Sequence, residues 1–224
     1  MPDIEKNIIS LQQQLPSHVK MVAVSKLKPV SDILEACKAG QTVFGENRVQ
    51  ELMSKKDMLP DNIEWHFIGH LQRNKVKFIV PFIAMIHSVD SFRLLKIINA
   101  EAAKIKRVVN CLLQFYIARE ETKFGFTLDE AVEMIEADDF RQLEYVKIGG
   151  VMGMATFTDN KELIRKEFRY LADCFKILKE KYFLHDTFFK EISMGMTGDW
   201  HVAVEEGSTM IRVGTLIFGE RIKR

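Results

Sequence analysis

Short apolar segments alternate along the chain with longer amphipathic ones, and this alternation constrains the fold more than any other feature of the sequence. Short runs rich in β-branched and aromatic residues indicate strands, whereas apolar residues that recur every three or four positions indicate helices. Strands that alternate with helices are typical of a parallel sheet. The predicted strands are residues 21–25, 42–45, 65–69, 85–89, 108–117, 147–152, 190–193 and 210–217.

The segments between these strands carry helical signals. Thr127 and Glu130 have the spacing of a capping box, in which each side chain bonds to the backbone of the other residue. A later segment has an apolar stripe at helical spacing: Ile164, Phe168, Leu171, Phe175, Leu178 and Tyr182. Before the first strand, residues 1–15 are a predicted amphipathic helix that ends before Pro16, and we expect it to cap one end of the fold.

The chain length fits a closed barrel. Eight strands in 224 residues leave about 28 residues for each strand and helix, which lies within the range of eight-stranded barrels. We therefore predict an α/β fold, a single (β/α)8 TIM barrel with an extra N-terminal helix. The alternative is an open doubly wound sheet, because strand order cannot be read from one sequence. No linker divides the chain, so we expect one domain over residues 1–224, with residues 1–15 as its capping helix.

Charge and composition exclude several classes of protein. The 32 Lys and Arg residues are balanced by 31 Asp and Glu residues, so the chain lacks the basic field that nucleic-acid binding needs. Acidic residues near the N-terminus do not suit a signal peptide, and the longest apolar run, residues 78–86, is far shorter than the roughly 20 residues of a membrane helix. The three cysteines form no CxxC pair. We expect a cytoplasmic protein with no nucleic-acid or membrane partner.

No metal site is predicted. His66 and His70 lie four residues apart, but on a strand this spacing separates them by roughly 13 Å, too far for one zinc ion. His87, at the end of the fourth predicted strand, is either a structural histidine or a general base.

The last two predicted strands end in residues suited to an anion. Phosphate in such barrels is commonly held by the loops after the seventh and eighth strands. Ser193 ends the seventh predicted strand, and Gly214 and Thr215 follow Arg212 in the eighth. Hydroxyl groups and closely approaching backbone N–H groups there suit a phosphate, although the glycines are equally compatible with plain turns. The absence of a Walker or GxGxxG motif argues against a nucleotide.

Lys26 follows the first predicted strand. A lysine at a barrel mouth is partly desolvated, which lowers its pKa and makes it a nucleophile toward aldehydes, whereas an ordinary solvated lysine is the simpler interpretation. An amine across the mouth from a phosphate site suits a phosphorylated aldehyde, of which pyridoxal phosphate is the commonest.

Five motifs, in order along nearly the whole chain, resemble one family. They are residues 24–29 (VSKLKP), 44–51 (FGENRVQE), 65–75 (WHFIGHLQRNK), 193–196 (SMGM) and 207–215 (GSTMIRVGT). The family is the pyridoxal-phosphate homeostasis proteins, relatives of the N-terminal barrel domain of alanine racemase. The resemblance implies the fold-type III barrel of that racemase and pyridoxal 5'-phosphate (PLP) as the bound cofactor.

The resemblance also implies roles for individual residues. Lys26 is expected to form the internal aldimine with PLP. Ser193 is expected to hold the phosphate together with the backbone at Gly214 and Thr215, and Arg212 is expected to face the pyridine nitrogen.

Further residues are implied at the mouth. Asn47 is expected beside the cofactor, with Lys28 and Lys123 as nearby secondary lysines. The sequence departs from the usual family pattern at Arg48, at His70 and over residues 198–200.

These observations favour a carrier over an enzyme. The length leaves no room for the racemase's additional domain with its second acid/base tyrosine, and Tyr116 is the remaining candidate in this chain. A guanidinium cannot give its proton to the ring nitrogen, so the ring beside Arg212 is a poor electron sink. We expect a catalytically inactive, monomeric protein that sequesters PLP and delivers it to PLP-dependent apo-enzymes in vitamin B6 homeostasis. The alternatives are a PLP-dependent amino-acid racemase and a scaffold that binds no cofactor.

Overall fold

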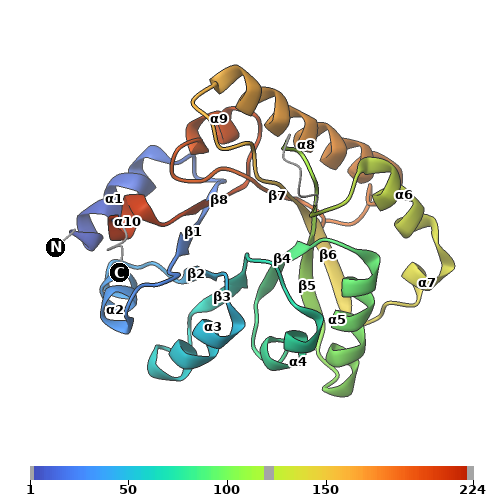
Figure 1. Cartoon of the computed structure of the whole chain (residues 1–224), viewed down its shortest axis with the longest axis horizontal. Coiled ribbons are helices and arrows are strands. Elements are labelled where there is room, and N and C mark those ends of the chain that lie inside the picture. Colours follow the sequence, from blue (N-terminus) through green and yellow to red (C-terminus); the bar gives the residue numbers. More distant parts are fainter. Residues whose placement is uncertain (1–2, 119–123, 221–224) are drawn as a thin grey trace.

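The computed structural model describes residues 3–118 and 124–220 and forms a closed barrel of eight parallel strands (Figure 1). Each strand pairs with the next, and β1 closes the barrel on β8 with Lys20 opposite Met210 and Ala23 opposite Val213. The (β/α)8 prediction is confirmed over the open sheet. The strands are β1 (Lys20–Val24), β2 (Val43–Glu46), β3 (Glu64–Phe67), β4 (Met85–Val89), β5 (Val109–Gln114), β6 (Val146–Met152), β7 (Glu191–Ser193) and β8 (Met210–Val213).

Helices surround the barrel (Figure 1). The capping box of Thr127 and Glu130 begins α6 as predicted, and the apolar stripe predicted for residues 164–182 lies on α8. No helix among the described residues is both long and apolar enough to cross a membrane. The helices are α1 (Ile4–Gln14), α2 (Val30–Lys38), α3 (Val49–Lys55), η1 (Lys56–Met58), η2 (Arg73–Lys75), α4 (Val76–Ile79), α5 (Phe92–Lys104), α6 (Leu128–Glu136), α7 (Asp138–Arg141), α8 (Lys161–Tyr182), α9 (Trp200–Glu205) and α10 (Thr215–Phe218).

The eighth strand is shorter than predicted. It ends at Val213, and the residues predicted as its second half form the single turn of α10. Gly214 turns the chain with φ −125° and ψ −62°, and its carbonyl accepts hydrogen bonds from the N–H groups of Ile217 and Phe218. The apolar residues after Gly214 therefore belong to a helical turn and not to a strand.

The N-terminal helix does not cap an end of the barrel, so that expectation was wrong. Instead α1 lies in the outer ring beside α2 and α10 (Figure 1). It buries Ile4, Ile8 and Leu11, and the Asn7 side chain donates to the carbonyl of Ile217 at 3.0 Å. Because α10 is only one turn long, α1 provides the helical cover for this sector of the barrel.

The barrel interior has an apolar layer and a polar layer. The apolar layer consists of Val22, Met85, Leu112, Met152 and Met210. Two residues further along β4 and β8, where side chains return to the same face, lie His87 and Arg212. The polar layer therefore lies nearer the carboxyl ends of the strands, where function concentrates in this fold.

Candidate functional site

A cavity of about 700 Å³ lies at the carboxyl ends of the strands. It is lined by five of the six residues predicted for the cofactor site: Lys26, Asn47, Arg212, Gly214 and Thr215. Residues from the loops after β6 and β7 also line it, and Phe157 on this rim is 98% exposed. The closed barrel therefore brings residues from the ends of three strands, β1, β2 and β8, to one cavity.

Lys26 lies two residues after the end of β1, in a tight turn, and is partly buried. The N–H of Lys28 donates to the carbonyl of Ser25 at 3.1 Å across this turn. Leu27 has a positive φ of 62°, a conformation that non-glycine residues rarely adopt. The N–H of Leu27 donates to Glu51 Oε1 at 2.5 Å, which ties this backbone to α3.

A buried ionic cluster holds the backbone of this turn in place. Glu46 Oε1 accepts hydrogen bonds from Ser25 Oγ at 2.7 Å and from Lys55 Nζ at 2.9 Å. Lys55 Nζ also donates to the Ser25 carbonyl at 2.9 Å and to Glu51 Oε1 at 2.6 Å. Burial raises the pKa of Glu46, while Lys55 and Ser25 oppose that rise. The cluster fixes the backbone on both sides of Lys26, and sequence reasoning did not identify it.

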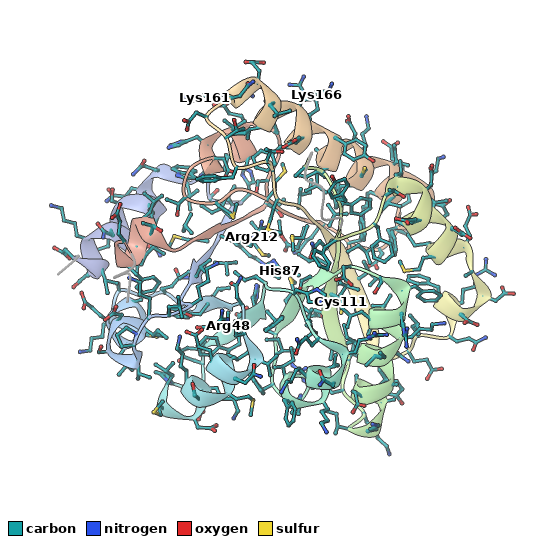
Figure 2. All side chains as sticks on the ribbon, viewed as in Figure 1. Arg48, His87, Cys111, Lys161, Lys166 and Arg212 are labelled. Atoms are coloured by element: carbon teal, nitrogen blue, oxygen red, sulfur yellow. The ribbon has the colours of Figure 1, made fainter. Side chains whose placement is uncertain are left out.

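Arg212 is a buried cation in the lining of the cavity. Its Nη1 donates to Ser193 Oγ at 2.6 Å, and its Nη2 donates to the carbonyl of Gly153 at 3.0 Å. Burial lowers the pKa of the guanidinium to about 10, against the opposing effect of Asp199, so Arg212 stays charged at neutral pH. Figure 2 shows Arg212 with His87 in the barrel interior.

Ser193, the sixth predicted residue, does not line this cavity. It is fully buried, and its Oγ contacts both Arg212 Nη1 and His87 Nδ1, the latter at 3.0 Å. His87 Nε2 lies 2.8 Å from His66 Nδ1. His87 is thus part of a buried polar network. The sequence alone does not connect these residues, because they lie on different strands.

Asn47 and the start of α10 offer polar groups to a ligand. Asn47 Oδ1 is buried and has no hydrogen-bond partner among the described residues. Thr215 is exposed at the first position of α10, where backbone N–H groups have no partner within the helix. A Cβ on Gly214 would lie 3.0 Å from the Val24 carbonyl, so a glycine allows this close approach. These groups suit a ligand with an anionic end.

Two further lysines, Lys28 and Lys123, were predicted near the cofactor, and the structure describes only the first. Lys28 lines the cavity, but its Nζ donates to the carbonyls of Phe218 at 2.7 Å and Gly219 at 3.2 Å, at the C-terminus of α10. Lys123 lies outside the described residues.

The positions that depart from the family pattern lie around the mouth. His70 contacts Asp90 at 3.1 Å and Phe124 on the rim, and Arg48 is exposed before α3. Asp199 Oδ1 accepts from the Met196 N–H at 2.5 Å, which closes the turn after β7. The departures therefore change the rim and leave Lys26 and Arg212 in place.

Comparisons with known proteins agree with the geometry. Residues 1–222 match the sequence model for the N-terminal domain of alanine racemase. The chain is 39% identical over 203 residues to the pyridoxal phosphate homeostasis protein of Aquifex aeolicus, covering 90% of this chain and 87% of that protein. It is 36% identical over 231 residues to the protein of the same name from Pasteurella multocida, covering 97% of each.

Solved structures give the same result. PipY of Synechococcus elongatus, solved with PLP bound, has a TM-score of 0.88 and 35% identity, covering 96% of this chain and 100% of that one. An alanine racemase of Clostridium difficile has a TM-score of 0.71 at 14% identity, covering 99% of this chain and 56% of that one, and shares the fold alone. The chain therefore belongs to the alanine racemase N-terminal domain family and, within it, to the pyridoxal phosphate homeostasis proteins.

Proposed function

We propose that this chain binds PLP in the cavity at the barrel mouth. The observation that carries the proposal is the presence of Lys26, Arg212 and the start of α10 around one cavity of about 700 Å³. These supply an amine for an aldehyde, a cation for a ring nitrogen and N–H groups for a phosphate. The buried, unpartnered Asn47 Oδ1 gives independent support, because a buried polar atom without a partner is costly unless a ligand or water satisfies it.

Different residues would contact different parts of the cofactor. Thr215 and the backbone at Gly214 would hold the phosphate, and Asn47 would bond to the cofactor beside them. Arg212 would face the pyridine nitrogen. We propose that Ser193 contributes through Arg212, because its Oγ already contacts that guanidinium and His87.

When bound, PLP supplies an aldehyde that reacts reversibly with a primary amine. Lys26 presents such an amine from a backbone that Glu51 and the cluster beneath it hold in place. Arg212 remains protonated at neutral pH, because its pKa of about 10 lies well above that range. It therefore donates a hydrogen bond to an unprotonated ring nitrogen without transferring its proton, and it has no lone pair with which to accept a hydrogen bond from a protonated one.

This arrangement favours storage and delivery of PLP over amino-acid turnover. An unprotonated ring stabilises a carbanion weakly, so the site retains aldehyde capture and lacks support for α-carbon chemistry. Capture by Lys26 is reversible, so a second amine, such as the lysine of an apo-enzyme, can take the cofactor. The protein would thus sequester PLP and deliver it to PLP-dependent apo-enzymes.

A racemase-like enzyme is the second candidate, and Tyr116 supports it. This tyrosine lines a neighbouring cavity of about 340 Å³ that shares Asn47 and Phe157 with the first. A tyrosine at the mouth is a candidate second acid/base group.

The two candidates are separated by one pair of assays on the PLP-loaded protein. Incubation with L- and D-amino acids should give no change in chirality and no keto acid, whereas mixing with an apo-aminotransferase should restore that enzyme's activity. Multiple turnover of any amino acid that is abolished in both Lys26→Ala and Tyr116→Phe would establish the racemase-like enzyme instead.

A further inference from the structure

Four buried polar side chains form a continuous hydrogen-bonded chain across the barrel interior. They come from four strands: Arg212 on β8, Ser193 on β7, His87 on β4 and His66 on β3. The successive distances are 2.6, 3.0 and 2.8 Å, and no member is more than 4% exposed. Arg212 is the one member that lines the cavity described above.

The chemistry of Arg212 sets the direction of the first hydrogen bond in this chain, and the need of the buried Ser193 proton for an acceptor sets the direction of the others. A guanidinium has N–H donors and no acceptor, so Ser193 Oγ accepts from Arg212. The Ser193 hydroxyl is then free to donate to His87 Nδ1, which leaves the proton of a neutral imidazole on Nε2. His87 Nε2–H accordingly donates to His66 Nδ1, and the proton of His66 also lies on Nε2.

Both imidazoles are held neutral. Burial lowers the pKa of His66 to about 3 and that of His87 well below its ordinary value. The positive charge of Arg212 lowers the pKa of His87 further. A neutral His87 can accept a hydrogen bond at Nδ1, which a protonated ring cannot do.

The far end of the chain therefore restrains the guanidinium. Nη1 is held by Ser193 Oγ and Nη2 by the Gly153 carbonyl, so the two bonds fix the plane of the group. Without an acceptor at His87, the proton of the buried Ser193 hydroxyl would have no acceptor. The hydroxyl would then be expected to reorient, because an unsatisfied buried donor is costly. That movement would weaken the support of Arg212 Nη1.

We propose that His87, supported by His66, is a positioning residue for Arg212 that acts through Ser193 and sets the orientation of the guanidinium at the cavity. The inference rests on the proposed function for the identity of that ligand. It assigns a role to two residues that do not line the cavity and whose connection to it depends on the closed barrel.

The first test compares His87→Phe, which has no hydrogen-bonding group, with His87→Gln, which retains an acceptor and a donor. Met85→Leu, in the apolar layer of the same strand, is the control for repacking of the interior. The probes are PLP and pyridoxine 5'-phosphate, which lacks the aldehyde and so reports ring and phosphate contacts without Lys26 chemistry.

His87→Phe should bind both probes about tenfold more weakly, the effect of losing one charge-assisted hydrogen bond, and should shift the absorption band of bound PLP. His87→Gln should recover most of the affinity and the band, and Met85→Leu should match the wild type. Wild-type affinity and absorption in His87→Phe would overturn the inference, as would an equal loss in Met85→Leu.

The second test uses nitrogen-15 NMR of the ligand-free protein, so it does not depend on the proposed function. His66 and His87 should both be neutral with the proton on Nε2, and the Arg212 guanidinium signals should broaden or average in His87→Phe but not in Met85→Leu. A proton on His87 Nδ1, or Arg212 signals unchanged in His87→Phe, would contradict the inference. Failure of the wild type to bind either probe would instead refute the proposed function and leave this test decisive.

Discussion

The buried histidine pair makes the free energy of unfolding depend on pH in a direction that can be worked out. Burial lowers the pKa of His66 from 6.5 to about 3, and that of His87 also lies well below 6.5. Between pH 3 and 6.5 the unfolded chain therefore binds protons that the native protein excludes. Stability accordingly rises with pH through this window and is fully present above pH 6.5.

The magnitude follows from linkage. Lowering the pH from about 7 to about 5 should cost about 2 kcal/mol for each histidine, and about 4 kcal/mol for the pair, because each pKa unit corresponds to about 1.4 kcal/mol. Glu46 and Asp199 have raised pKa values and contribute in the opposite direction. Comparison with a variant that lacks one histidine cancels these contributions.

Urea unfolding at the two pH values measures this difference for the wild type and for His87→Gln. The variant should lose about half of the pair's contribution, so its stability should fall by about 2 kcal/mol less than that of the wild type on acidification. An identical pH dependence in the two proteins would refute the assignment of His87 as a buried neutral imidazole.

Three further predictions concern the cluster under Lys26 and the phosphate end of the cavity. Lys55→Met should destabilise the protein by about 3 to 5 kcal/mol in urea unfolding, because it leaves the Glu46 carboxylate buried without its cation. Lys96→Ala, which removes an exposed ion pair to a neighbouring helix, is the matched control and should change stability by less than about 1 kcal/mol. Thr215→Val should weaken binding of PLP several-fold in fluorescence titration but leave binding of unphosphorylated pyridoxal unchanged, and equal losses would show that Thr215 does not serve the phosphate. Ser193→Ala should weaken both ligands to a similar degree, because it acts through Arg212, and a loss confined to PLP would restore Ser193 as a phosphate ligand.

The barrel was predictable because strand and helix periods alternate clearly along the chain. The end of the eighth strand was not, since the apolar residues at 216–218 fit a strand as well as the single turn of α10, which buries Ile217 and Phe218. The position of α1 depends on α10 being only one turn long. That helical turn was not predicted, because its residues were assigned to the eighth strand. The local sequence pattern therefore predicted most of the elements, but it did not predict how α10 and α1 together complete the outer layer of helices.

The site was predictable where it follows the ends of strands. Lys26 and Arg212 each lie at or just after such an end, and their meeting at one mouth follows from a parallel barrel. The bond between His87 and Ser193 joins residues 106 positions apart, and the one between His66 and His87 joins residues 21 apart. Such pairs depend on strand order and register, which one sequence does not contain.

We propose that Lys26 is the residue that captures PLP in this cavity. Borohydride reduction of the PLP-loaded protein, followed by proteolysis and mass spectrometry, locates the pyridoxyl group. Lys28→Ala provides the matched control, because Lys28 lines the same cavity while its ammonium bonds to the carbonyls at the end of α10. We predict that the label lies on the Lys26 peptide, persists in Lys28→Ala and disappears from this cavity in Lys26→Ala. A label chiefly on Lys28 or Lys123, unchanged by Lys26→Ala, would show that Lys26 is not the residue that captures PLP.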